Sequence, residues 1–172
     1  MPVRPATTRD AAAIAAVYNH YIRTSTATFE EDPVNDTEMA TRIATVLGHG
    51  LPWLVAEQGH RDGKSDGGVL GYAYATPWRP RSAYRFAAEV TVYVAADSAA
   101  RGVGSALYGQ LLPAVRAADR RTVLAGIALP NVASVALHER CGFTKVAHLE
   151  RVGFKHDRWI DVGYWQRQLD PD

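Results

Sequence analysis

Apolar residues recur every three or four positions in four segments of the chain, and this spacing predicts four helices. These segments are 7–22, 36–50, 102–119 and 131–141. Short apolar runs rich in β-branched and aromatic residues, bounded by Gly, Pro, Asp or Ser, predict strands. These runs are 1–6, 52–58, 69–78, 86–95 and 122–129, and the stretch 143–169 predicts two further strands with a turn near Gly153.

The order of these elements predicts an α/β (α+β) fold with a mixed, twisted sheet of about seven strands and helices on both faces. The strand–helix–strand segment 86–128 predicts a right-handed parallel crossover. The Gly-rich polar stretch 59–68 is typical of a mobile hairpin tip. Because no repeat, low-complexity segment or linker interrupts the pattern, we expect residues 1–172 to form one domain.

Charge and cysteine content narrow the class of function. The chain has 19 Lys and Arg against 18 Asp and Glu, a net charge of +1, so we expect neither nucleic acid nor a membrane surface as partner. Its one cysteine, Cys141, cannot form an internal disulfide. The N-terminus has no apolar signal-like run, and together these features predict a cytoplasmic protein.

The stretch AARGVGSAL, residues 99–107, places Gly102 and Gly104 between a predicted strand and a predicted helix. Bare main chain at a helix N-terminus favours a phosphate or diphosphate, and Arg101 adds a cation. A dinucleotide-binding fingerprint is excluded because Leu107 stands where the third glycine is required, and the Gly-Lys-Ser/Thr of a Walker A loop is absent. A tight turn without any ligand is the alternative.

Glu89 is the only acidic residue in the apolar strand FAAEVTVYV. A carboxylate in low-dielectric surroundings has a raised pKa, which suits a general base near neutral pH. A solvent-facing glutamate is the alternative. The six histidines show no metal-ligand spacing, so we expect no metal site, and no Gly-x-Ser-x-Gly elbow indicates a serine hydrolase.

The glycine stretch, followed by NVASVALHERCGF at 131–143, resembles the acetyl-CoA site of the GNAT acyltransferases. Further stretches, TSTATFEEDP, RPRSAYRFAAEVTVYV and VGFKHDRWIDVGYWQ, resemble the phosphinothricin and methionine sulfoximine N-acetyltransferase branch of that family, over nearly the whole chain. The sequence departs from the family pattern at Ala99, where an Arg or Gln is usual, and we expect altered diphosphate contacts there.

The resemblance implies acetyl-CoA as co-substrate and direct transfer with both substrates bound together. The implied cofactor-binding residues are Val92, Tyr93, Val94, Ala100, Arg101, Gly102, Val103, Gly104, Ser105, Asn131 and Ser134. The strand residues would offer main-chain N–H and C=O groups to the pantetheine as an added strand would, although simple sheet pairing is the alternative. Asn131 is also a helix N-cap under any interpretation.

The resemblance also implies a catalytic pair, Glu89 as base and His138 as the acid that protonates the departing thiolate. Packing near the helix end is the alternative for His138, and Tyr108 is an alternative donor. Arginines before the catalytic strand suit a carboxylate or phosphinate. The implied acceptor site comprises Phe29, Glu30, Arg79, Pro80, Arg81, Glu89, Val90 and Thr91.

The implied reaction is acetylation of the α-amine of a small amino acid such as phosphinothricin, methionine sulfoximine or methionine sulfone, an activity associated with herbicide resistance. Another small amine, a protein N-terminus, or a non-catalytic CoA-binding sensor are the alternatives. The family also implies a homodimer, with a structural or dimer-related role for Lys155, Trp159 and Asp161 of the closing motif.

Overall fold

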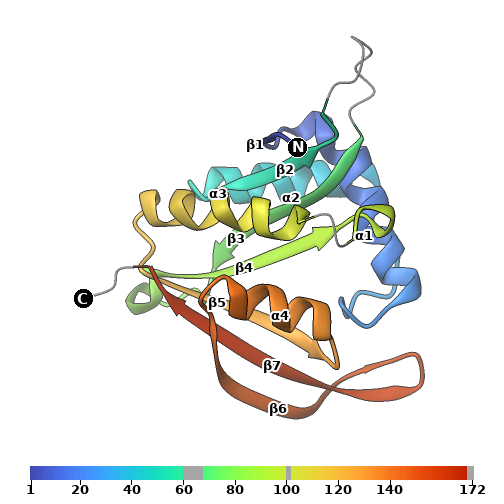
Figure 1. Cartoon of the computed structure of the whole chain (residues 1–172), viewed down its shortest axis with the longest axis vertical. Coiled ribbons are helices and arrows are strands. Elements are labelled where there is room, and N and C mark those ends of the chain that lie inside the picture. Colours follow the sequence, from blue (N-terminus) through green and yellow to red (C-terminus); the bar gives the residue numbers. More distant parts are fainter. Residues whose placement is uncertain (60–67, 100–101, 170–172) are drawn as a thin grey trace.

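A mixed seven-stranded sheet organises the chain in the computed structural model, which describes residues 1–59, 68–99 and 102–169 (Figure 1). The strand order is β1-β2-β3-β4-β5-β7-β6. Only β4 and β5 run parallel, and every other neighbouring pair is antiparallel. The strands are β1 (Val3–Pro5), β2 (Trp53–Glu57), β3 (Val69–Pro77), β4 (Ala87–Val94), β5 (Thr122–Leu129), β6 (Thr144–Lys155) and β7 (Arg158–Gln168).

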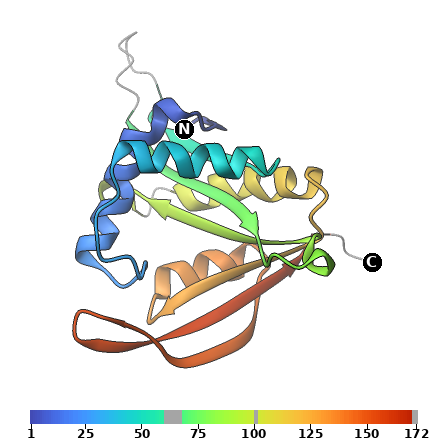
Figure 2. The same cartoon turned by 180° about the vertical axis from the view of Figure 1, so that it is seen from behind.

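Helices cover both faces of this sheet. The helices α1 (Ala11–Thr24) and α2 (Asp36–Gly48) lie on one face, and α3 (Val103–Ala117) and α4 (Val132–Arg140) lie on the other (Figures 1 and 2). Three short 3-10 turns span Thr8–Asp10, Ser82–Tyr84 and Ala96–Ser98. The α3 stripe of Leu107, Leu111 and Val115 is fully buried against the sheet, as its helical spacing requires.

The expected fold class and element order are confirmed, and so is the parallel arrangement of the strands on either side of α3. None of the helices in the described ranges is long and apolar enough to cross a bilayer. Most of the Gly-rich stretch for which a hairpin tip was predicted, residues 60–67, lies outside the described residues.

The predicted turn near Gly153 is wrong. Strand β6 continues to Lys155, and the turn is made by His156 and Asp157, whose φ angles are +51° and +56°. A two-residue loop with two positive φ angles matches the twist of a hairpin. Gly153 serves a different purpose, because a Cβ there would overlap the ring of Phe29. The glycine therefore admits an aromatic ring against the strand.

Strands β4 and β5 pair only over Ala87–Glu89 and Thr122–Leu124. Beyond Glu89 the two parallel strands separate, although each keeps its other neighbour: β3 pairs with β4 as far as Val94, and β7 pairs with β5 as far as Leu129. The separation opens the middle of the sheet on the side where α3 and α4 begin. This opening is the structural basis of the candidate site.

Candidate functional site

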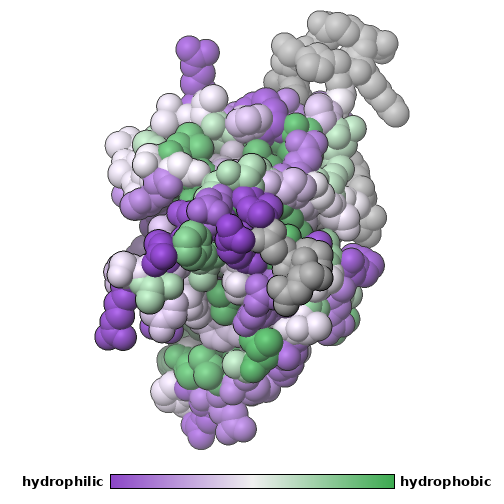
Figure 3. Space-filling model, turned by 90° about the vertical axis from the view of Figure 1, so that its left-hand side faces the viewer, coloured by the Kyte–Doolittle hydropathy of each residue, from purple (hydrophilic) through white to green (hydrophobic). Residues whose placement is uncertain are grey.

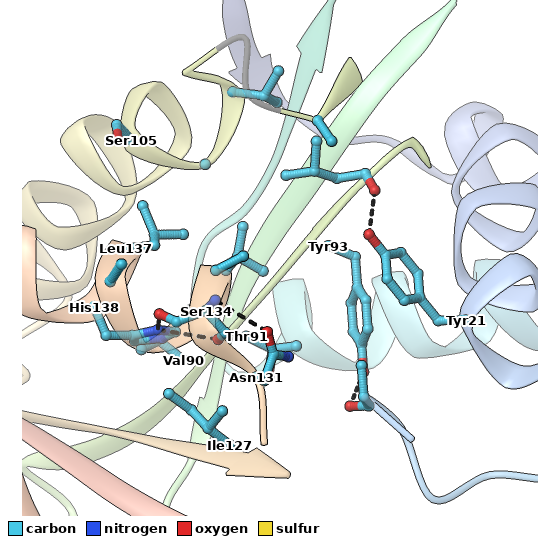
Figure 4. A pocket seen from close by; sticks show the side chains of 18 of the residues that line it. Tyr21, Val90, Thr91, Tyr93, Ser105, Ile127, Asn131, Ser134, Leu137 and His138 are labelled. Atoms are coloured by element: carbon cyan, nitrogen blue, oxygen red, sulfur yellow. Dashed lines mark hydrogen bonds between the residues drawn. The ribbon is translucent and has the colours of Figure 1, made fainter. Parts of the chain in front are cut away.

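A cleft of about 620 Å³ lies where β4 and β5 separate, between the N-terminal ends of α3 and α4 (Figure 4). It brings together most of the residues that the sequence predicted for cofactor binding, with part of the predicted acceptor site. The predicted residues that line it are Val90, Thr91, Val92, Tyr93, Val94, Gly102, Val103, Gly104, Ser105, Asn131, Ser134 and His138. Ala100 and Arg101 lie outside the described residues.

The main chain of β4 presents free polar groups to this cleft. Trp78 N donates to Ala87 O and Ala95 N donates to Leu70 O, and the register between β3 and β4 is unshifted over its length. Because antiparallel pairs alternate, the odd-numbered residues of β4 bond to β3 and the even-numbered ones face the other way. Val92 and Val94 therefore turn their N–H and C=O groups into the opening.

Tyr93 differs from the prediction, because its main-chain groups face β3 and it reaches the cleft with its side chain alone. Its ring packs edge-on against Tyr18, and its hydroxyl donates to Ala27 O at 3.3 Å. The tyrosine thus ties the loop after α1 to the wall of the cleft (Figure 4).

Strand β5 presents the opposite edge. Leu169 N donates to Arg121 O, and the pairing of β5 with β7 is also unshifted, so the even-numbered residues Gly126 and Ala128 face the cleft. No strand in the described part of the chain pairs with these groups. Two strand edges with unpaired amides favour an extended ligand that carries amides of its own.

The sequence analysis missed several lining residues, among them Tyr21, Ala27 and Gly126. The hydroxyl of Tyr21 donates to Val94 O at 2.6 Å, so that carbonyl is already bonded while the Val94 N–H stays open (Figure 4). The sequence carries no local signal for Tyr21 or Ala27, because their place at the cleft depends on the packing of α1 and its following loop against the end of β4. Gly126 in the apolar run TVLAGIAL was a visible signal, because glycine in a strand often marks close approach.

The glycines of the 99–107 stretch have two different functions. Gly102 is the N-cap of α3 and has φ of +76°, the left-handed conformation that favours glycine. Helix geometry leaves the N–H groups of Val103, Gly104 and Ser105 without intrahelical acceptors, and the helix dipole favours an anion beside them. Gly104 instead allows close helix packing, since a Cβ there would lie 2.7 Å from Cδ2 of Leu137.

Helix α4 is held in place by its N-cap residue Asn131 and by the side chain of His138. Asn131 Oδ1 accepts from Ser134 N at 3.1 Å, which is the N-cap bond that the sequence predicted. His138 is 3% exposed. Its Nδ1 lies 2.7 Å from Ser134 O (Figure 4). Its Nε2 lies 2.8 Å from the hydroxyl of Tyr108.

These contacts assign the tautomer of His138. A carbonyl only accepts, so Nδ1 carries the proton and Nε2 accepts from the hydroxyl of Tyr108. Burial lowers the pKa of His138, and the bond to Ser134 only partly opposes this. The neutral ring therefore has no proton free for a ligand. The wholly buried Tyr108 hydroxyl is committed to the same bond, and this geometry argues against both side chains as proton donors.

Glu89 is the last residue of β4 that pairs with β5, so it lies beside the end of the cleft where the two strands part. It is not itself among the lining residues, but its Oε1 would be 3.4 Å, an ordinary contact distance, from a Cβ at Gly126, which does line the cleft. Burial raises the pKa of Glu89, and the positive charge of Arg79 partly offsets that effect. A half-buried carboxylate with a raised pKa, next to a cleft, is suited to take up a proton.

The predicted acceptor residues are dispersed around this end of the cleft. Arg79, Pro80 and Arg81 line a second cavity of about 420 Å³ with Arg85 and Arg120 among its other walls. Phe29 packs on Gly153. The carboxylate of Glu30 is occupied by Arg42 and by the hydroxyl of Tyr18, which leaves it poorly placed to hold a ligand.

Metal chemistry finds no support among the residues that the structure describes, since no group of three or more His, Cys, Asp or Glu side chains is arranged to hold an ion. Cys141 is partly buried, and burial raises the pKa of its thiol. Both properties make it a poor nucleophile.

Comparisons with known proteins agree with this geometry. Residues 3–163 match the acetyltransferase (GNAT) domain. A phosphinothricin N-acetyltransferase of Alcaligenes faecalis is 49% identical over 162 residues, covering 94% of this chain and 79% of that protein. An L-methionine sulfoximine/L-methionine sulfone acetyltransferase of Pseudomonas aeruginosa is 35% identical over 98% of this chain and 95% of its own length.

Among solved structures, a GNAT superfamily phosphinothricin acetyltransferase of Sinorhizobium meliloti, in complex with acetyl-CoA, superposes with a TM-score of 0.89. It is 35% identical, and the match covers 97% of this chain and 87% of that one. The likeness therefore extends over both sheet faces and all elements that bound the cleft.

The neutral state of the buried His138 predicts how the stability of the protein changes with pH. The pKa of His138 is lower in the folded protein than in the unfolded chain, so the unfolded chain binds a proton first as the pH falls. The folded state therefore loses stability as the pH drops below the pKa of the unfolded chain. The free energy of unfolding of the wild type should fall below pH ~6.5 by up to ~1.4 kcal/mol per pH unit more than that of His138→Gln. Urea unfolding from pH 8 to 5 measures this, and parallel curves would contradict the neutral assignment.

Proposed function

The chain belongs to the GNAT acetyltransferase family, and we propose that it transfers the acetyl group of acetyl-CoA to the α-amine of a small amino acid such as phosphinothricin, methionine sulfoximine or methionine sulfone. The observation that carries the proposal is the meeting of two unpaired strand edges at the carboxylate of Glu89. That arrangement supports an extended thioester on one side and an amine beside a base on the other.

The free main-chain groups of β4 and β5 and the N-terminus of α3 suit acetyl-CoA, the proposed acetyl donor. The pantetheine arm has two amides in an extended chain, which suits the free N–H and C=O groups of Val92, Gly126 and Ala128. The amides at the start of α3 suit the diphosphate. An N–H of β4, from Val92 or Val94, is available to polarise the thioester oxygen as negative charge develops there.

Glu89 acts as the general base, directly or through one water. The amine nitrogen attacks the thioester carbon, the C–S bond breaks, and the proton of the amine passes to the carboxylate. The raised pKa of Glu89 makes it a better proton acceptor than an exposed carboxylate. Since His138 has no proton to give, we assign protonation of the thiolate to a solvent water that reaches the sulfur. His138 then serves to hold α4 against α3.

The acidic part of the acceptor binds the guanidinium groups of the second cavity. Arg79 lies close enough to Glu89 to lower its pKa, so it links that cavity to the reacting end of the cleft. Arg81 continues the positive wall, and an Arg fork suits a carboxylate or a phosphinate. An acceptor with an acid group beside its amine would span from these arginines to Glu89.

A homodimer is also proposed, with the exposed side of the β6–β7 hairpin as its interface. Apolar side chains gather on this hairpin, and Figure 3 shows apolar surface toward the end of the molecule where β6 and β7 lie. They are Val146, Leu149, Val152, Phe154 and Trp159, each at least 40% exposed. Exposed apolar side chains gathered on one element are typical of protein contact surfaces.

Replacement of the base tests the catalytic assignment. Glu89→Gln should lower kcat/KM by about 10²- to 10⁴-fold and leave CoA affinity unchanged, because the side chain meets only the acceptor end. The acidic limb of the wild-type pH profile, which reports the raised pKa of Glu89, should vanish. Thiol release from acetyl-CoA measures the rates, and calorimetry with CoA measures the affinity.

The same assay runs with a panel of amino acids and their sulfone, sulfoximine and phosphinate analogues. Turnover of none of them, with CoA still bound, would favour a protein acceptor or a sensor. Full activity of Glu89→Gln would remove this residue as the base.

Removal of the two arginines proposed to bind the acceptor should change the KM of the amino acid and not that of acetyl-CoA. Arg79→Ala/Arg81→Ala should raise the KM of the amino acid by at least ~10-fold, equivalent to ~1.4 kcal/mol, and leave the KM of acetyl-CoA unchanged. Steady-state kinetics in both substrates measures this. Arg23→Ala, an exposed arginine on α1, is the matched control, and equal rises in both KM values would contradict the assignment.

The dimer prediction concerns mass in solution. Light scattering should give twice the chain mass for the wild type and a single chain mass for Phe154→Glu/Trp159→Glu. Leu47→Glu, an exposed apolar residue on α2, should leave the dimer intact. A monomeric wild type at micromolar concentration would refute the interface.

A further inference from the structure

Lys155 is a buried charge that the proposed chemistry does not use. It is 2% exposed, and its Nζ donates to Thr28 O and to Glu30 O, each at 2.9 Å. No carboxylate in the described part of the chain lies within ion-pair distance of it. Burial of an ammonium is costly unless its hydrogen bonds compensate, so the two carbonyls are its principal compensation.

The two carbonyls flank Phe29, so Lys155 fixes the main chain on both sides of that residue. The ring of Phe29 rests on Gly153, two residues before Lys155 on the same strand. Because side chains alternate along a strand, Gly153 and Lys155 face this loop together. The opposite side of the hairpin end carries the exposed Phe154, whose ring meets Trp159 edge-on at 5.2 Å.

Other elements hold the same loop from different sides. Arg42 of α2 binds both carboxylate oxygens of Glu30, at 2.7 and 3.1 Å. The hydroxyl of Tyr18 lies 2.7 Å from Oγ1 of Thr28. Residues 27–30, which we call the clamped loop, therefore have contacts to α1, α2, β4 and β6. Among the side chains that the structure describes, only Lys155 binds two main-chain carbonyls of this loop.

The clamped loop begins in the wall of the cleft. Ala27 lines the cleft beside Thr91 and Tyr93, and its carbonyl accepts from the hydroxyl of Tyr93. Thr91 and Glu89 are both odd-numbered residues of β4, so their side chains emerge on the same face of the sheet. The position of the loop therefore sets the width of the cleft on the side where the acceptor amine must approach Glu89.

We propose that Lys155 is a positioning residue for the acceptor half of the site, acting through the clamped loop and touching neither substrate. The inference rests on the proposed function for its kinetic consequence. The donor half, built from α3, α4 and the free edges of β4 and β5, has no contact with this lysine. Lys155 therefore governs affinity for the acceptor and leaves affinity for CoA unchanged.

The test replaces Lys155 with Met, which keeps an unbranched chain one atom shorter and removes the three donors. Hydrogen exchange, followed by mass spectrometry, should be at least ~10-fold faster in Lys155→Met for peptides covering 25–31 and unchanged for peptides covering α3 and β4. The acceptor KM should rise by ~10-fold with little change in kcat or in the KM of acetyl-CoA. Lys145→Met, an exposed lysine on the same strand, should match the wild type in every measurement.

Unchanged exchange over 25–31 would overturn the proposal, and so would equal rises in both KM values or faster exchange throughout the protein. Should Lys155→Met fail to fold, Lys155→Gln, which keeps two donors on a shorter chain, is measured in the same way. If the wild type turns over no acceptor, the proposed function fails by itself. The exchange experiment still decides whether Lys155 holds the loop.

Discussion

After Glu89, β4 and β5 no longer pair, and this gap in the sheet determines how the surrounding elements are arranged. Each strand keeps one partner and loses the other, so a row of main-chain N–H and C=O groups faces an open cleft. Unpaired buried amides destabilise a folded chain, and the two edges are best satisfied by a ligand that behaves as a strand. The separation begins beside the one carboxylate of β4, that of Glu89, whose pKa is raised by burial.

The helices on either side of the sheet serve the two halves of this site differently. On one face, α3 and α4 approach closely because Gly104 leaves room for Leu137, and their N-terminal ends meet at the cleft. The pair Tyr108 and His138 locks that contact with a bond between a buried hydroxyl and a neutral imidazole. On the other face, α1 and its following loop supply Tyr21 and Ala27 to the cleft wall.

The end of the β6–β7 hairpin has two faces with different consequences. One face carries Gly153 and Lys155 and holds the loop that borders the acceptor side. The other exposes Phe154 and Trp159, which are more than half accessible. The β6–β7 hairpin, which is far from Glu89 in sequence, is therefore linked to the cleft through the clamped loop. A contact made on the outer face of the hairpin, at Phe154 or Trp159, lies within a few residues of Lys155.

Neighbouring residues were enough to predict the order of the elements, a glycine-bearing turn before α3, the N-cap at Asn131 and Glu89 as the acidic residue of the central strand. These features are local, since periodicity, glycine conformation and capping depend on neighbouring residues. Contacts between distant elements were needed to show that Tyr93 contributes a side chain and not main chain, because strand register selects which groups face the opening. The same kind of contact places the last turn at His156 and Asp157, directs Glu30 toward Arg42, and leaves the buried His138 with its ring proton bonded to Ser134 O. Each of these outcomes depends on partners many residues away, which spacing along the chain does not encode.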